Sequence, residues 1–177
     1  MAWSAFPTLV DGQVWTGAHT QLVQANFNET APAKATTAGS HFAGTGANSI
    51  AERILQAAVV LTTETTTSTS YTNLTTTGGQ VTATTGAKAL IAYHCRQQTS
   101  IANTNVWTSV TVGAPSSIAA SDNWALSMDL TGSQFYHGVT YIEPNLTPGT
   151  QTFTMQYRVS STNTGTFSTR RINVVPF

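Results

Sequence analysis

Two groups of residues in this sequence could carry out chemistry: the few carboxylates, and a histidine beside the only cysteine. A glycosidase needs two carboxyl groups on either side of a cleft. Asp122 and Asp129 fall in one predicted strand region, but their odd separation places them on opposite faces of a regular strand. We therefore do not expect acid–base catalysis by paired carboxylates.

His94 and Cys95 are adjacent, so within a strand their side chains also point to opposite faces. They cannot readily share a metal ion, and they cannot form a nucleophile–base pair. We predict a buried structural cysteine and a histidine on the sheet surface. No enzymatic activity, no metal ion and no cofactor are expected.

Aromatic side chains offer a different chemistry, which is stacking against sugar rings. Trp107, Trp124, Tyr136 and Tyr141 could form such a platform on a sheet. Trp124 and Tyr141 are in phase with the apolar residues of their predicted strands, which favours a place in the core for these two. The binding of a glycan by the others stays open.

The N-terminal segment carries apolar residues but little local structure that could bury them, because Pro7 and an Asp11–Gly12 turn interrupt it. A short helix is predicted after it, with Thr16 as N-cap. Apolar anchors on such an arm usually dock on a partner. The predicted partner-binding residues of this attachment arm are Trp3, Phe6, Leu9, Trp15, Leu22 and Phe27.

The low charge of the chain excludes several classes of partner. Charged residues make up 8% of it, and Lys plus Arg balances Asp plus Glu at 7 each. Binding to nucleic acid depends on many Lys and Arg contacts to phosphate, so no nucleic-acid partner is expected. The same argument excludes an anionic membrane surface, and no apolar run approaches the ~18 residues of a membrane span. With no signal-peptide pattern at the N-terminus, we expect a protein made in the cytoplasm.

From about Gln56 onward, apolar residues recur at every second position, which predicts β-strands. These strands must position the candidate residues named above. Turn signals then recur every 8–15 residues, which is typical of a β-sandwich or barrel. We predict an all-β fold, with about eight to nine antiparallel strands in a jelly-roll-like sandwich. The segment before it, from residue 34 to 53, is predicted to be an extended arm or a small hairpin. The expected domains are residues 1–55, an attachment arm with a short helix, and residues 56–177, the sandwich.

The threonine-rich stretch from Val60 to Gly86 looks like low-complexity sequence. Mucin-like stalks combine Ser and Thr with proline, and this stretch contains none. Threonine is β-branched and fits a half-solvated pleated surface. The stretch is therefore predicted to form two or three strands at the edges of sheets, including residues 67–74.

The order of several segments resembles a group of virion proteins from tailed phages of actinobacteria. The matching segments are DGQVWTGAHTQLVQANFNETAPAKATTAGSHFAGTGANSIAER, TTSTSYTNLTTTGGQVTATTGAKALIAYHC, SSIAASDNWALSMD and LTPGTQTFTMQYRVSSTNTGTFSTRRINVVPF. The resemblance implies a non-enzymatic structural protein, with an N-terminal attachment region followed by a jelly-roll-like sandwich. Such proteins are described as decoration, head-fibre or minor tail proteins.

We expect a capsid decoration protein on the outer surface of the phage particle. Its expected partners are the major capsid protein or another virion protein, and further copies of itself in a homotrimer. The alternative is a minor tail or tail-fibre protein whose sandwich binds host-surface glycans. A hydrolase on a β-sandwich is the least favoured hypothesis, because Asp122 and Asp129 are expected on opposite faces of a strand and could not act as an acid–base pair.

Overall fold

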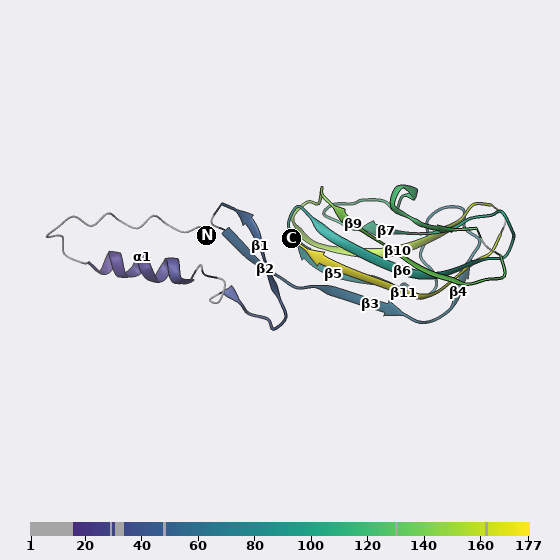
Figure 1. Cartoon of the computed structure of the whole chain (residues 1–177). Helices are drawn as coiled ribbons and strands as arrows, with labels where there is room; N and C mark the ends of the chain where they lie inside the picture. Colours follow the sequence, from purple (N-terminus) through teal and green to yellow (C-terminus); the bar gives the residue numbers. More distant parts are fainter. Residues whose placement is uncertain (1–15, 29, 31–33, 48, 130, 162) are drawn as a thin grey trace. The chain divides into compact units, whose positions relative to one another are not determined.

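The computed structural model describes residues 16–28, 30, 34–47, 49–129, 131–161 and 163–177 (Figure 1). Their contacts form two compact units, which divide between Ile54 and Leu55. Phe177 belongs with the first unit. The predicted domain boundary after residue 55 lies next to this division. None of the described helices is long and apolar enough to cross a membrane.

The first unit contains a helix and a hairpin. Helix α1 (Gly17–Asn28) begins after Thr16, whose hydroxyl and backbone N–H both lie 3.0 Å from His19 Nδ1. Strands β1 (His41–Gly46) and β2 (Ser49–Arg53) pair antiparallel, with His41 opposite Arg53. The sequence left an extended arm and a hairpin open, and the structure has the hairpin.

Glu52 of β2 fastens the segment before β1 to this hairpin. Its Oε1 accepts hydrogen bonds from Thr37 N at 2.8 Å and from the Ser40 hydroxyl at 2.6 Å. Both of its oxygens also accept from Thr36 N, and Oε2 accepts from the Thr36 hydroxyl. Led by the bonds from Ser40 and Thr36, these donors lower the pKa of Glu52 to about 2.

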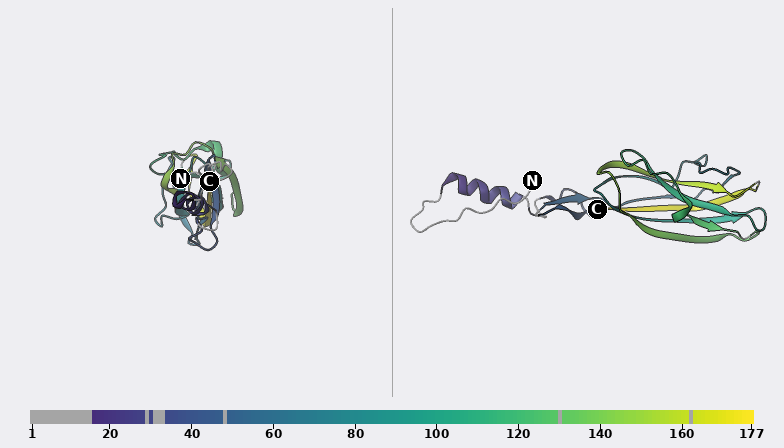
Figure 2. Two further views of the ribbon diagram at one scale, coloured as in Figure 1. Left: turned by 90° about the vertical axis from the view of Figure 1, so that its left-hand side faces the viewer. Right: turned by 90° about the horizontal axis from the view of Figure 1, so that it is seen from above.

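The second unit is an all-β sandwich of nine strands, as the sequence predicts. The strands are β3 (Gln56–Val60), β4 (Glu64–Thr66), β5 (Gln80–Thr85), β6 (Ala89–Thr99), β7 (Val106–Val112), β8 (Leu126–Met128), β9 (Phe135–Glu143), β10 (Gly149–Val159) and β11 (Gly165–Pro176). One sheet has the order β5-β10-β7-β8, and the other has the order β3-β11-β6-β9, with β4 also paired to β11. Figure 2 shows the strands from two further sides.

The pairing is that of one long hairpin of strands rolled into two sheets. β7 pairs with β8, β6 with β9, β5 with β10, and β3 with β11, all antiparallel. Counted outward from the connection between β7 and β8, successive pairs alternate between the two sheets, which is the topology of a jelly roll. The first and last strands of the sandwich, β3 and β11, are therefore neighbours in one sheet, and β5 and β10 are neighbours in the other.

The core lies between the two sheets and follows from the period of two in the sequence. Inward residues of β6 alternate with outward ones, and Ile91, Tyr93 and Cys95 are fully buried. On β10, Phe153, Met155 and Tyr157 are buried opposite them. These buried positions have the period of two that predicts the strands after Gln56.

The predicted strand over residues 67–74 is wrong. The threonine-rich stretch does contain two edge strands, β4 and β5, but residues 67–74 form none, and Thr72 makes an isolated bridge to Tyr157 of β10. The backbone of Ser68 and Thr72 still bonds to β10, but between them the Ser68 hydroxyl bonds locally, donating to Ser70 O at 2.6 Å and accepting from Ser70 N at 3.2 Å. Such local bonds compete with the ladder of a sheet. Most of the stretch is thus an ordered loop between β4 and β5.

Two further expectations also need correction. Trp124 is not in the strand with Leu126 but in a 3₁₀ turn, Asp122–Trp124, whose N-cap hydroxyl, Ser121 Oγ, accepts a hydrogen bond of 3.2 Å from Asn123 N. The period of two predicts that Phe135 points inward with His137, but Phe135 is 54% exposed. It is the first residue of an edge strand, so the sheet has no further strand to cover it.

Candidate interaction surface

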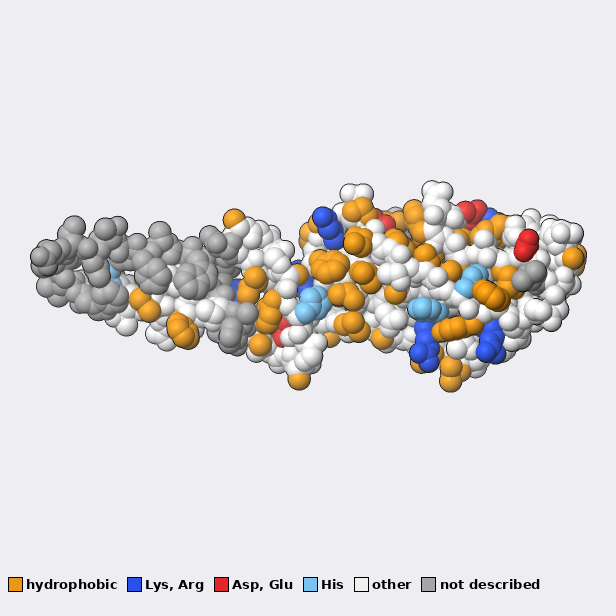
Figure 3. Space-filling model, in the orientation of Figure 1, with side chains coloured by type: hydrophobic (Ala, Val, Ile, Leu, Met, Phe, Trp, Pro, Cys, Tyr) orange, Lys and Arg blue, Asp and Glu red, His pale blue; other side chains and the backbone are white. Residues whose placement is uncertain are grey.

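The two sheets of the sandwich present chemically different outer faces. We call the outward side of β3, β11, β6 and β9 the apolar face (Figure 3). Its large exposed apolar side chains are Val59, Tyr136 and Ile142, which are 50%, 45% and 56% exposed. None of the large exposed apolar residues of the described chain lies on β5, β7, β8 or β10. Exposed apolar surface on one side of a protein is typical of an interaction site.

Gly138 makes room for the side chain of His94 on the apolar face. A Cβ at this position would lie 2.2 Å from His94 Nδ1, so only glycine leaves room for the imidazole of the neighbouring strand. The His94 ring therefore lies over the backbone of β9 and stacks on Tyr136, with the ring centroids 6.0 Å apart.

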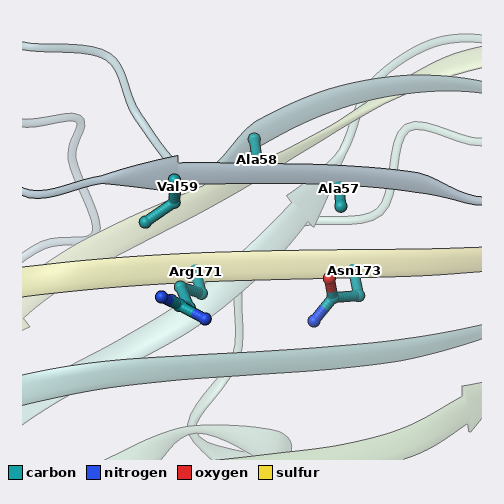
Figure 4. Close-up of a pocket in the computed structure, with 5 residues that line it drawn as sticks. All are labelled: Ala57, Ala58, Val59, Arg171 and Asn173. Carbon is teal, nitrogen blue, oxygen red and sulfur yellow. The ribbon is translucent and has the colours of Figure 1, made fainter.

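A shallow hollow lies on the same face between β3 and β11 (Figure 4). Ala57 and Val59 point to the same side as Arg171 and Asn173, with which they are paired. Ala58 points to the other side and packs against the core. The small side chains of β3 leave the Arg171 guanidinium accessible from this hollow.

The charged side chains on the described part of the apolar face are all positive. Arg96 and Arg171 point outward from β6 and β11, and both are exposed. Within the part of the chain that is described, the outward positions of these four strands carry no Asp or Glu. An occupant of this face would therefore meet apolar side chains and two guanidinium groups.

The outer face of β5 and β10 is covered with hydroxyl groups instead. Thr82 lies 3.0 Å from Thr152, and Thr84 lies 2.9 Å from Thr150, in each case between the two hydroxyl oxygens. Gln80 Nε2 donates to Thr154 Oγ1 at 2.9 Å. We call the part of this surface formed by residues 80–84 and 150–154 the hydroxyl face; it is polar and carries no charged side chain, as expected for threonine on the exposed side of a strand.

Trp107 was a candidate for sugar stacking, and the structure shows its ring in contact with Arg158. The guanidinium carbon lies 3.7 Å from the ring centroid, which is a cation–π contact. Arg158 also forms an ion pair with Asp122, whose Oδ1 accepts from the Tyr71 hydroxyl at 2.7 Å. These bonds, led by the one from Arg158, lower the pKa of Asp122. The sequence analysis missed this cluster, because its four members come from three distant parts of the chain.

The residues first considered for chemistry are held apart. Cys95 is fully buried, and burial raises the pKa of its thiol to about 12. His94 lies on the opposite face of the same strand, as the strand phase predicts. Tyr141 packs against the core as expected, while Trp124 is half-buried in its 3₁₀ turn and stacks on Tyr141, with the ring centroids 6.0 Å apart. No cluster of three potential metal ligands occurs among the residues with described positions.

Of the predicted attachment residues, Trp3, Phe6, Leu9 and Trp15 lie outside the described residues. Leu22 and Phe27 lie on α1, where Leu22 is half-buried and Phe27 is 71% exposed. The buried residue of this helix is Asn26. Phe27 is thus available to a partner of the first unit.

No protein-family model matches this chain, and a search of the curated proteins finds no match.

Proposed function

We propose that this chain is a structural protein of a phage particle, and that it decorates the outer surface of the head as an oligomer. Its partners are the major capsid protein, or another virion protein, and further copies of itself. The first unit attaches the protein and the sandwich projects from the particle.

The observation that carries the proposal is the apolar face. Three large apolar side chains from β3 and β9 lie in water there, beside two arginines without an acidic partner among the described residues. A free monomer gains nothing from such a surface, and a flat exposed sheet is an aggregation risk. In an assembly the same surface is covered, so its burial contributes to association. The near-zero net charge of the chain further favours packing among neighbours.

Copy number in purified virions tests the proposal. Quantitative mass spectrometry, with the major capsid protein as internal reference, should find hundreds of copies of this chain per particle. Images of particles that lack the protein should lose density over the head. A handful of copies, or unchanged heads, would contradict decoration and favour a tail component.

A second candidate function is the binding of host-surface glycans by the sandwich. The hydroxyl face supports it, because paired threonine hydroxyls on a flat uncharged sheet can exchange hydrogen bonds with sugar hydroxyls. A glycan array with the intact protein tests this function. Replacing both partners, Thr82→Val with Thr152→Val, should abolish binding without leaving an unpaired hydroxyl. Trp107→Ala serves as a comparison that removes the ring but leaves the hydroxyl rows intact.

A further inference from the structure

Strand β9 is an unprotected edge of the sandwich. It is the outermost strand of its sheet and pairs on one side with β6. No described residue forms a ladder with its other side, so half of its backbone N–H and C=O groups are directed away from the sheet. The other edge strands are shorter, with three residues in β4 and in β8, five in β3 and six in β5. β9 has nine.

The usual devices that protect a sheet edge are missing from β9. Its sequence, FYHGVTYIE, contains no lysine, arginine or proline, and its register with β6 runs from Phe135 to Glu143 without a bulge. Phe135, Tyr136 and Ile142 are each about half exposed, at 54%, 45% and 56%. A long, flat and apolar edge of this kind is a template for pairing with another strand.

We propose that the occupant of this edge is β9 of a second copy, paired antiparallel about a two-fold axis at Val139. The two sandwiches then share one continuous sheet. This inference deepens the proposed self-association and rests on it. It replaces the expected trimer by a dimer as the unit of assembly.

The inside–outside pattern restricts the register of this pairing. Directly opposite residues of two paired strands point to the same face, and His137, Val139 and Tyr141 point inward in each copy. An odd-numbered residue must therefore lie opposite an odd-numbered one, and an even-numbered residue opposite an even-numbered one. The two-fold axis then passes between a residue and the same residue of the other copy. Among these positions Val139 is the middle of Phe135–Glu143, so this register alone pairs every residue of the strand. Pro144 follows immediately and ends the strand.

The side chains are compatible with that register. Tyr136 faces Ile142 of the other copy on the apolar face, and the small Gly138 faces Thr140. The one acid of the strand, Glu143, faces Phe135 of the other copy, so like charges are never opposite each other. Arg96 is paired with Tyr136 on the β6 side. Its guanidinium is thus one strand away from the axis and separated from its counterpart.

Sedimentation equilibrium of the full chain tests the dimer. The unmodified protein should behave as a dimer, and a trimer or a monomer at tens of micromolar would overturn the proposal. The double variant Tyr136→Lys with Ile142→Lys places lysine opposite lysine twice, and should weaken dimerisation about a hundredfold. The variant Tyr136→Glu with Ile142→Lys places opposite charges together and should restore the dimer.

A matched control separates the edge from the apolar face as a whole. Val59→Lys adds the same charge at a similarly exposed position of β3, on the same face but at the far edge of the sheet. It should leave the dimer intact. Loss of the dimer in Val59→Lys but not in the double lysine variant would show that the contact runs through another part of the face. Circular dichroism of each variant checks that the sandwich is folded.

Cysteine cross-linking reads the register directly. In the proposed pairing the two Val139 Cα atoms are about 4.5–5.5 Å apart, within the range of a disulfide. The two Thr140 residues are diagonal neighbours at about 7–8 Å, beyond that range. Val139→Cys should therefore form a linked dimer under mild oxidation, and Thr140→Cys should not. The native Cys95 is fully buried and does not interfere. Cross-linking of Thr140→Cys alone would refute the register.

These results are distinguishable from a failure of the proposed function. A monomer that is nevertheless present in hundreds of copies per virion would leave decoration standing and reject the β9 pairing. A dimer present in only a handful of copies per virion would support the β9 pairing and reject decoration of the head.

Discussion

Arg170, which is fully buried, donates a hydrogen bond of 2.9 Å from Nη2 to Oε2 of Glu64, 106 positions earlier in the chain. Its Nη1 donates to the carbonyl of Thr76 at 3.2 Å, and its guanidinium lies 5.6 Å from the ring of Tyr157. The other oxygen of Glu64 accepts from the backbone N–H and the hydroxyl of Thr76. This buried ion pair thus links β4 and, through Thr76, the threonine-rich loop to the core, in addition to the bridge between Thr72 and Tyr157.

Removing the charge of Glu64 should therefore destabilise the sandwich. Glu64→Gln keeps an acceptor for Thr76 but leaves the Arg170 guanidinium buried without a counter-charge. We expect a loss on the order of 3 kcal/mol in the free energy of unfolding. The paired change Arg170→Met with Glu64→Gln should recover part of this loss, because no unpaired charge remains. Urea denaturation curves measure both effects, and an unchanged midpoint in Glu64→Gln would contradict this role of the pair.

The stability of the sandwich should decrease in acid. Burial opposes the charged form of Glu64, but the hydrogen bonds from Thr76 and the charge of Arg170 outweigh it and lower the pKa. The pKa of Asp122 is lowered as well. A carboxyl group with a lowered folded-state pKa stabilises the fold above its unfolded pKa, and this contribution is lost as the pH falls through the folded pKa. Urea midpoints should thus be constant near neutral pH and fall below about pH 4.5. In Glu64→Gln the decrease should be smaller.

Glu52 should control the order of the segment between α1 and β1. In Glu52→Ala the backbone N–H groups of Thr36 and Thr37 lose their acceptor. Hydrogen exchange at these two amides should become faster, while amides in the sandwich should keep their rates because they belong to the other compact unit. Glu143→Ala is a suitable control, since it removes a carboxylate from the sandwich. Equal exchange in the Glu52 variant and the unmodified chain would show that these bonds do not hold the segment.

Deletion of residues 1–30 should abolish attachment to the particle and leave the sandwich folded. The core of the sandwich comes from residues 74 to 174, so the truncation removes none of it. Binding to particles that lack the protein, followed by co-sedimentation, measures attachment, and thermal unfolding measures the fold. Unfolding of the truncated chain would show instead that the arm belongs to the core.

A single substitution examines the arm more finely. Phe27→Ala removes an apolar side chain that is 71% exposed, so the melting temperature should not change. Attachment should weaken if this ring docks on the particle. Gln24→Ala, an exposed polar position on the same helix, is the matched control. Equal occupancy of the two variants would remove Phe27 from the attachment surface.

Most of the sandwich could be predicted because its strands alternate strongly. The inward positions of β6 and β10 follow from the period of two, and burial confirms them. The geometric separation of His94 from Cys95 has the same origin. The strand prediction failed around Ser68 and Ser70, where side chains with hydroxyl groups dominate. These side chains can bond the local backbone or face water from a strand, and the order of residue types does not distinguish the two.

The sequence by itself determined the fold class, the low charge of the chain and the faces of the longest strands, because these depend on composition and on neighbours along the chain. Only the tertiary structure decided which residues far apart in sequence meet, such as Arg170 with Glu64 and Arg158 with Asp122. It also decided that β9 lies at an edge and that the large exposed apolar side chains of the sandwich strands all lie on the sheet β3-β11-β6-β9. Strand order is a property of the rolled hairpin as a whole. The pattern within one strand records which face is buried, but not whether another strand lies beside it.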